Sequence, residues 1–416
     1  MSGKNTFPLP NDPIWISKLL NWANHHYPFF AYFTDNGIPY PHQGFKHQFY
    51  AAKSAFPLKE ATAIYGKQKM VGIIGYDYKN VVEKLTSDHP APVDCPESVF
   101  FLPELEILIE ENQISVIHEH ADQLLSEILA FAHPLIPNPH VLVTAMTDKE
   151  TYFSNIQSIK NHIISGDLYE MNYCMGFTFE EKKWDPIQGF EALMKRSAMP
   201  FSALFRAEDL YLVCASPERF LKKTGDQWIA QPIKGTIKRG ANAEEDSIFQ
   251  DYLANSEKER AENLMIVDLM RNDLSKVSKV GSVEVEELFG IYAFPKVSQM
   301  ISTVKSKVRS DLSLETIVQA TFPMGSMTGA PKIMCMELIE RHEDFKRGWY
   351  SGALGYFEAD GDFDLNVVIR SIVFDKASGK GYFAVGSAIT HDADAEYEYQ
   401  ECLLKSEAIR EVLEGF

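Results

Sequence analysis

The order of strand-like and helix-like segments is the feature that most constrains the fold of this chain. Apolar, strand-like runs recur after Gly166 as "LYEMNYCMGFTF", "FSALFRA", "LYLVCAS" and "WIAQPIKG". Helical patterns occur at 148–166, at 256–273 and at 393–413, with no regular alternation of strand and helix. An irregular mixture of this kind favours an α+β fold with mainly antiparallel sheets over a doubly wound parallel sheet.

A proline-rich segment is the best candidate for a boundary between domains. "HPLIPNPH", from His133 to His140, holds three prolines in eight residues. Before it lie short apolar runs such as "MVGIIGYDY" and "SVFFLPELEILIE", which are typical of antiparallel strands. We therefore expect an N-terminal domain over residues 1–140.

The composition excludes several classes of protein. The net charge is -18, which argues against nucleic-acid binding, because that function needs a basic face. No apolar run reaches the length of a membrane span, and the N-terminus has no signal-peptide pattern. The five cysteines are scattered and form no CxxC pair, so neither disulfides nor zinc are indicated. We expect a reduced, cytoplasmic protein.

Two of the predicted helices carry pairs of acidic residues. Glu259 and Glu262 are three residues apart, and Glu398 and Glu401 repeat this spacing, which places each pair on one helix face. Two structural interpretations stay open: a capping box of Ser256 with Glu259, and a solvated amphipathic face. If both pairs face one pocket, four carboxylates require a cation there. Ligands that are all oxygen suit Mg²⁺.

A glycine-rich loop and a strand arginine indicate an anionic ligand. In "FPMGSMTGAPK", Gly325 and Gly329 enclose Ser326 and Thr328 just before a predicted helix. Such a loop can aim backbone N–H groups at an anion, although a plain strand-to-helix turn is the alternative. The spacing does not match a nucleotide-phosphate loop, and a carboxylate fits as well. Arg370, in the apolar strand "FDLNVVIRSIVF", also requires an anion if it is buried.

Six segments in this order and spacing resemble the chorismate-utilising enzymes. They are "PIKGT", "ENLMIVDLMRNDL", "GSMTGAPK", "YSGALGY", "NVVIRS" and "EYEYQECLLKSEA". That family includes anthranilate synthase component I, aminodeoxychorismate synthase component I, and the isochorismate and salicylate synthases. The resemblance covers residues 146–412, and the N-terminal third matches more weakly. It implies a catalytic domain built as an α/β sandwich of two antiparallel sheets, with helices outside and the site between the sheets.

The resemblance also implies roles for individual residues. Glu262 and Glu401 match direct Mg²⁺ ligands, and Glu259 and Glu398 match residues that hold the ion's waters. The residues implied to contact chorismate, several through its carboxylates, are Ser326, Thr328, Gly329, Tyr356, Arg370, Gly386 and Lys405. The residues expected to take part in catalysis are Lys234, Glu170, Glu262 and Lys405.

Lys234, in "PIKGT", distinguishes members of this family from one another. Aminodeoxychorismate synthases carry lysine at this position, whereas anthranilate synthases resemble "PIAGT". The implied mechanism is attack of the Lys234 amine on C2 of chorismate, loss of the C4 hydroxyl, and addition of ammonia at C4. The product would be 4-amino-4-deoxychorismate, a precursor of para-aminobenzoate and folate. A free lysine is only about 0.1% neutral at pH 7.4, so we expect burial to lower the pKa of Lys234.

Three positions depart from the family pattern. Gln299 stands where many members have histidine, so another group must protonate the leaving hydroxyl. Glu170 replaces a glutamine, or the lysine of the water-adding enzymes, which argues against isochorismate chemistry. Ala388 stands where glycine is common. Two alternatives therefore stay open: an anthranilate synthase component I, and a non-catalytic homologue that binds chorismate.

The source of ammonia is predicted from the cysteines. None of the five lies in the G-x-C-x-G context of a nucleophile elbow. The chain should therefore not hydrolyse glutamine, and the resemblance implies a separate glutamine amidotransferase subunit as partner.

Overall fold

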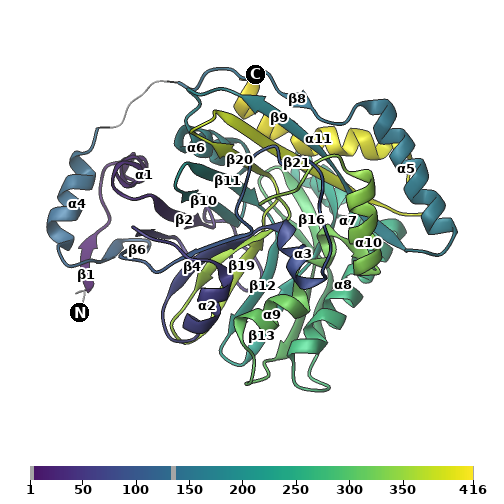
Figure 1. Ribbon diagram of the computed structural model, residues 1–416, viewed down its shortest axis with the longest axis horizontal. Helices are drawn as coiled ribbons and strands as arrows, with labels where there is room; N and C mark the ends of the chain where they lie inside the picture. Colours follow the sequence, from purple (N-terminus) through teal and green to yellow (C-terminus); the bar gives the residue numbers. More distant parts are fainter. Residues whose placement is uncertain (1–3, 133–136, 416) are drawn as a thin grey trace.

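Two antiparallel sheets form the framework of the molecule (Figure 1). The computed structural model describes residues 4–132 and 137–415, so part of the predicted boundary segment lies outside the described residues. The first sheet runs in the order β1 (Lys4–Pro8), β7 (Gln113–Ile117), β6 (Leu105–Ile109), β3 (Gln48–Ala52), β2 (Phe29–Thr34), β10 (Phe201–Ala207), β11 (Leu210–Ser216), β20 (Ser371–Asp375), β21 (Lys380–Ile389), β9 (Glu170–Glu180) and β17 (Gly329–Ala330), with β8 (Thr144–Ala145) paired to β9.

The second sheet has the order β14 (Ile233–Lys238), β16 (Val297–Lys307), β13 (Gln227–Gln231), β12 (Arg219–Thr224), β19 (Phe363–Val367), β18 (Ala353–Phe357), β4 (Met70–Ile74) and β5 (Ser98–Phe101), with β15 (Glu284–Ala293) paired to β16. Neighbouring strands are antiparallel, as in β9 with β21 and β14 with β16. The prediction of an α+β fold with mainly antiparallel sheets is confirmed.

The first sheet is buried on both faces at strand β2, whose side chains point alternately to the two faces. In β2, Phe29, Ala31 and Phe33 join a core shared with the second sheet. Phe30 and Tyr32 point the other way, into a second core against the outer helices. The strand is therefore apolar throughout, unlike a half-exposed strand.

The helices fall into two groups (Figure 1). The core on the outer face of the first sheet includes residues of α1 (Trp15–His26), α4 (Ala121–Ala130), α5 (Lys149–Ile164), α6 (Pro186–Ser197), α10 (Lys332–His342) and α11 (Ala395–Glu414). The core that includes the second sheet takes in α2 (Leu58–Ile64), α8 (Glu257–Val277) and α9 (Leu314–Thr321). The remaining described helices are α7 (Ala243–Asn255) and α3 (Lys79–Val82), with short turns η1 (Tyr76–Tyr78) and η2 (Gly325–Met327).

The helix predicted to begin at Ser256 is present, and its cap resolves one of the open interpretations. The Ser256 side chain accepts a hydrogen bond from the Glu259 backbone N–H at 3.4 Å. The Ser256 backbone N–H donates to Leu253 and not to the Glu259 carboxylate. Glu259 therefore supplies only its backbone to the cap, and its side chain can face elsewhere.

Strands from before residue 140 belong to both sheets. β2 pairs with β10 in the first sheet, and β4 pairs with β18 in the second. The division into residues 1–140 and 146–412 stays a prediction. In the part of the chain that the structure describes, no helix has the length and apolar character that a membrane crossing requires.

Candidate active site

A cavity of about 630 Å³ lies where α8 and α11 meet the edge of both sheets. It brings together most of the residues predicted from the sequence, although they come from segments far apart in the chain. The predicted residues that line it are Lys234, Glu259, Glu262, Ser326, Arg370, Gly386, Glu398, Glu401 and Lys405. Convergence of charged groups of both signs in one cavity is typical of an active site.

The acidic pairs of α8 and α11 face this cavity from two sides. Glu262 and Glu398 are buried, and each has one carboxylate oxygen (Oε1) without a hydrogen-bond partner in the structure. Burial raises the pKa of Glu262 to about 7, and the neighbouring Glu170 and Glu259 add to this effect. The pKa values of Glu259 and Glu398 are also raised, first by burial and then by Glu401. Such carboxylates require a cation to stay ionised.

The donor set fits a hard divalent cation, because all four candidate ligands are carboxylates and two of them hold buried oxygens without a hydrogen bond. The four side chains do not converge on one point in this structure. Within the described residues, no three acidic, histidine or cysteine groups are close enough together to hold a metal ion. Lys258 lies between the two helices, with its Nζ 3.5 Å from Glu398 Oε1 and 3.9 Å from Glu262 Oε1.

Lys234 projects from β14 into the wall of the cavity and pairs with Glu170. The distance from Lys234 Nζ to Glu170 Oε1 is 2.8 Å, and the Glu170 side chain is 1% exposed. Glu170 is not among the lining residues, so it supports Lys234 from behind. Burial alone would lower the pKa of Lys234, but Glu170, Glu262 and Glu218 together raise it. The expectation that burial makes this amine neutral is therefore wrong for the ligand-free cavity.

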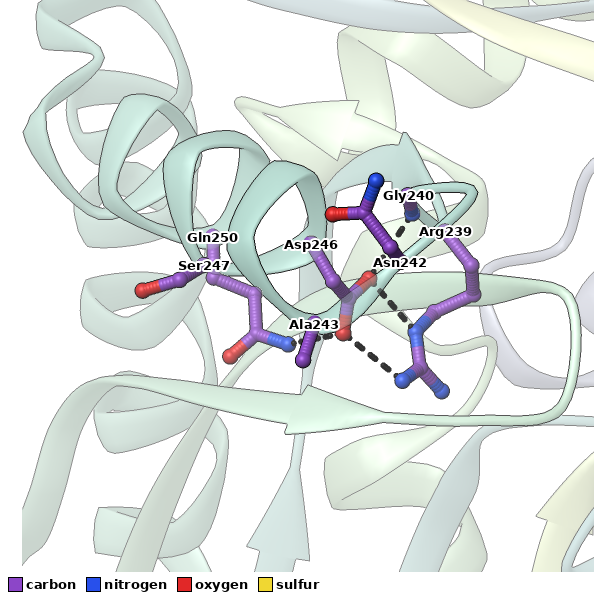
Figure 2. A pocket seen from close by; sticks show the side chains of 7 residues that line it. All are labelled: Arg239, Gly240, Asn242, Ala243, Asp246, Ser247 and Gln250. Atoms are coloured by element: carbon purple, nitrogen blue, oxygen red, sulfur yellow. Dashed lines mark hydrogen bonds and ion pairs between the residues drawn. The ribbon is translucent and has the colours of Figure 1, made fainter.

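The strand that carries Lys234 is fixed at its far end (Figure 2). Arg239, directly after β14, forms two hydrogen bonds of 2.7 Å with the Asp246 carboxylate on α7. The Gly240 backbone N–H and the Gln250 amide also donate to Asp246, both at 2.9 Å. The paired Arg239 and Asp246 hold β14 against α7 and so limit movement of the Lys234 backbone.

Glu218 is a residue of the site that the sequence analysis missed. It lies in "SPERF", in the tight connection between β11 and β12, and lines the cavity with only 5% of its surface exposed. Burial raises the pKa of Glu218 to about 7, against the opposing effects of Ser326 and Lys234. The sequence feature that could have identified Glu218 is its place between two apolar, strand-like segments, because a charge is costly to bury there.

Arg370 and Lys405 supply positive charge to the cavity. Arg370 has φ of 51°, a left-handed conformation that is uncommon for residues other than glycine. In the described residues no carboxylate lies within ion-pair distance of its guanidinium, which donates only to the Lys405 carbonyl at 3.4 Å. Lys405 Nζ contacts Glu401 at 2.5 Å and the Gly386 carbonyl at 2.9 Å. A half-buried, unpaired guanidinium fits an anionic ligand.

Three of the residues predicted to bind substrate lie outside the cavity. Tyr356 is enclosed in the core against Phe33 and Phe45, and its hydroxyl accepts from the Lys46 backbone N–H. This placement corrects the assignment of Tyr356 to substrate binding, because its position in β18 directs the ring into the core between the sheets. The tyrosines that line the cavity are Tyr350 and Tyr397.

Thr328 and Gly329 contact the glycine-rich loop itself and the neighbouring strand β9. The Thr328 hydroxyl donates to the Met324 carbonyl at 3.2 Å, within the loop itself. Gly329 has φ of +131°, and a Cβ atom at this position would lie 2.1 Å from the Glu170 carbonyl oxygen. Only glycine allows β17 to approach the strand that holds Glu170. Of the predicted loop residues, Ser326 lines the cavity and Thr328 and Gly329 do not, so their role in substrate binding stays a prediction.

The two-sheet fold thus holds a cavity in which carboxylates from two helices meet cationic groups that can bind an anion. The chain matches the chorismate binding enzyme family over residues 31–411 and belongs to it. Among its relatives, "Aminodeoxychorismate synthase component 1" of Klebsiella aerogenes is 33% identical over 351 residues, covering 83% of this chain and 77% of the relative.

"Probable aminodeoxychorismate synthase, chloroplastic" of Oryza sativa subsp. japonica is 42% identical over 269 residues, covering 64% of this chain. The matched region spans only 30% of that longer relative. Among solved structures, anthranilate synthase component I from Streptococcus pneumoniae TIGR4 superimposes with a TM-score of 0.78 at 23% identity, covering 98% of this chain and 92% of that one. At this identity the likeness shows the fold.

Proposed function

We propose that this chain is the chorismate-aminating component of an aminodeoxychorismate synthase, which converts chorismate and ammonia to 4-amino-4-deoxychorismate for para-aminobenzoate and folate synthesis. The observation that carries the proposal is the Lys234 amine in the cavity wall, 2.8 Å from the Glu170 carboxylate and facing the same cavity as Glu218. Relatives that carry this name support it. A cytoplasmic location stays a prediction.

The cavity divides into two binding regions by charge. Arg370, Lys405 and the Ser326 loop would hold the carboxylates of chorismate. Glu262 and Glu401, with Glu259 and Glu398 around them, would hold Mg²⁺, which neutralises charge on a substrate carboxylate and fixes its orientation. The two regions together would align the ring of chorismate against β14.

Lys234 and Glu170 form the nucleophile and its proton acceptor. Because the pKa of Lys234 is raised, its amine must first transfer a proton, and Glu170 Oε1 is in hydrogen-bond contact to accept it. The neutral amine then attacks C2, the ring double bond shifts, and the bond from C4 to its hydroxyl breaks. Ammonia then forms a bond to C4, the ring double bond shifts back, and the bond from C2 to the Lys234 nitrogen breaks, which releases Lys234. Glu170 also contributes a buried, unpaired Oε2 oxygen that can take the proton.

Glu218 supplies the proton that the leaving hydroxyl needs. A carboxyl group with a pKa of about 7 is about half protonated at neutral pH, so it can act as a general acid. Gln299 cannot take this role, because its amide does not ionise; it lines the cavity and donates to the Thr236 hydroxyl at 3.3 Å. The departure from histidine is thus compensated by a residue in the connection between β11 and β12.

Product analysis tests the proposal and separates it from its two alternatives. The purified chain is incubated with chorismate, Mg²⁺ and ammonium, and the product is identified by mass and absorbance. We expect 4-amino-4-deoxychorismate. Anthranilate would show an anthranilate synthase instead, and binding of chorismate without turnover would show a non-catalytic homologue.

A pH profile should reveal Glu218 as the acid. Formation of the covalent adduct on Lys234, measured without ammonia in rapidly quenched samples by mass spectrometry, should slow as pH rises through about 7, because only the protonated carboxyl donates. Glu218→Gln should slow the step by about 10²–10⁴-fold and remove this alkaline limb. If Glu218→Gln forms the adduct at the native rate with the same decline at alkaline pH, Glu218 is excluded as the general acid. Chorismate affinity, measured by calorimetry, controls for misfolding.

The nitrogen source should be ammonia alone. With glutamine as sole nitrogen donor the purified chain should make no product, whereas ammonium at alkaline pH should support turnover. The reason is that all five cysteines lack an elbow context, and four of them are buried. Release of glutamate by the isolated chain would contradict the proposed amidotransferase partner.

A further inference from the structure

Lys258 occupies an unusual place between the two acidic helices. Its ammonium lies 3.5 Å from Glu398 Oε1 on α11 and 3.9 Å from Glu262 Oε1 on its own helix, α8. These two atoms are among the buried oxygens that lack a hydrogen bond. In the described part of the chain, Lys258 is the one cationic side chain within ion-pair distance of either carboxylate. Lys405 and Lys234 instead contact Glu401 and Glu170.

We propose that Lys258 is a displaceable counter-ion of the divalent-cation site. In the metal-free protein its ammonium bridges α8 and α11, and it moves out of the site when the metal ion binds. This inference rests on the proposed Mg²⁺ site and assigns a role to a residue that is not itself a metal ligand.

The surroundings of Lys258 allow both states. Its side chain is 46% exposed, so it can turn towards solvent without leaving a buried cavity behind. The ammonium already lies 5.0 Å from the centre of the Tyr397 ring, which is itself exposed and offers a second resting place through a cation–π contact. By contrast, Lys234 is 11% exposed and tied to Glu170, so it cannot move aside in the same way.

The electrostatic balance requires such a cation. Glu262 and Glu398 are buried, and each holds an oxygen without a hydrogen bond, so their negative charge is costly unless a cation lies beside it. An ammonium in the site therefore stabilises the metal-free arrangement, and it must compete with an incoming cation for the same oxygens.

Lys258→Met removes the charge and keeps the aliphatic stem. The matched control is Lys276→Met on the same helix, where the lysine is 49% exposed and pairs with Asp273 away from the cavity. Both variants and the native chain are titrated with Mn²⁺ as a spectroscopic probe by electron paramagnetic resonance, and with Mg²⁺ by calorimetry. Thermal unfolding is recorded with and without Mg²⁺.

We expect Lys258→Met to bind Mn²⁺ about tenfold more tightly than the native chain, because the competing charge is gone. Its metal-free form should unfold at a lower temperature than the native metal-free form, while the Mg²⁺-saturated forms should differ little. Lys276→Met should match the native affinity. If the native chain binds Mn²⁺ and Lys258→Met binds it equally or more weakly, the role of Lys258 is overturned while the metal site remains. A native chain that binds neither ion would overturn the metal site and the inference together.

Discussion

Lys234→Ala should abolish formation of 4-amino-4-deoxychorismate while chorismate still binds. The Mg²⁺ ligands and the anion-binding groups lie on other segments, so their contacts with the substrate remain. Without the amine, C2 is no longer blocked and ammonia can reach it directly. We expect the 4-amino product to fall by at least about 10³-fold and a slow formation of 2-amino-2-deoxyisochorismate to appear. In the native chain, quenched samples should show an adduct on the peptide that holds Lys234.

Controls for this variant follow from its contacts. Removal of Lys234 leaves the buried Glu170 carboxylate without its partner, which could destabilise the fold. The double variant Lys234→Ala with Glu170→Gln removes the unpaired Glu170 charge. It should show the same loss of product and a more stable fold than Lys234→Ala alone. Lys223→Ala, which removes an ion pair with Asp362 elsewhere in the second sheet, should keep the native product. Native rates of 4-amino product in Lys234→Ala would show that Lys234 is not the nucleophile.

The sequence predicted the components of the site better than their arrangement. Acid pairs at a spacing of three residues can be read from the chain because one helix face follows from the helical repeat. That α8 and α11 face one cavity depends on long-range pairing, such as β21 with β9, which no local pattern contains. The antiparallel fold could be predicted because it follows from the absence of a regular strand–helix alternation.

The residues missed or misplaced have a common physical cause. Glu218 and Lys258 obtain their properties from neighbours distant in sequence, the first from burial and the second from Glu398 on another helix. The pKa of Lys234 was expected to fall with burial, but three carboxylates from different segments reverse the direction. Tyr356 fits the family pattern, yet its position in β18 directs the ring between the sheets. Local sequence does not determine these environments.

Glu262→Ala should remove turnover by weakening Mg²⁺ binding, with the fold intact. Glu262 holds a buried oxygen without a hydrogen bond, and its pKa is about 7 in the metal-free cavity. Because a metal ion binds the ionised carboxylate, protons compete with it: native Mg²⁺ affinity should weaken as pH falls through about 7. Glu262→Ala should lower turnover by about a hundredfold or more and weaken Mn²⁺ binding in the same samples. EDTA should silence the native enzyme.

The fold should survive this change, because the variant removes a carboxylate that its neighbours repel. Metal-free Glu262→Ala should therefore unfold at the native temperature or slightly above it, after allowance for the small cavity that is created. Glu257→Ala, an exposed glutamate in the first turn of the same helix and outside the cavity, controls for a general loss of negative charge. It should leave turnover and Mn²⁺ affinity unchanged. Full activity of the native chain in EDTA, or native Mn²⁺ affinity in Glu262→Ala, would exclude the magnesium assignment, because the proposed site needs the cation for turnover and needs the Glu262 carboxylate to hold it.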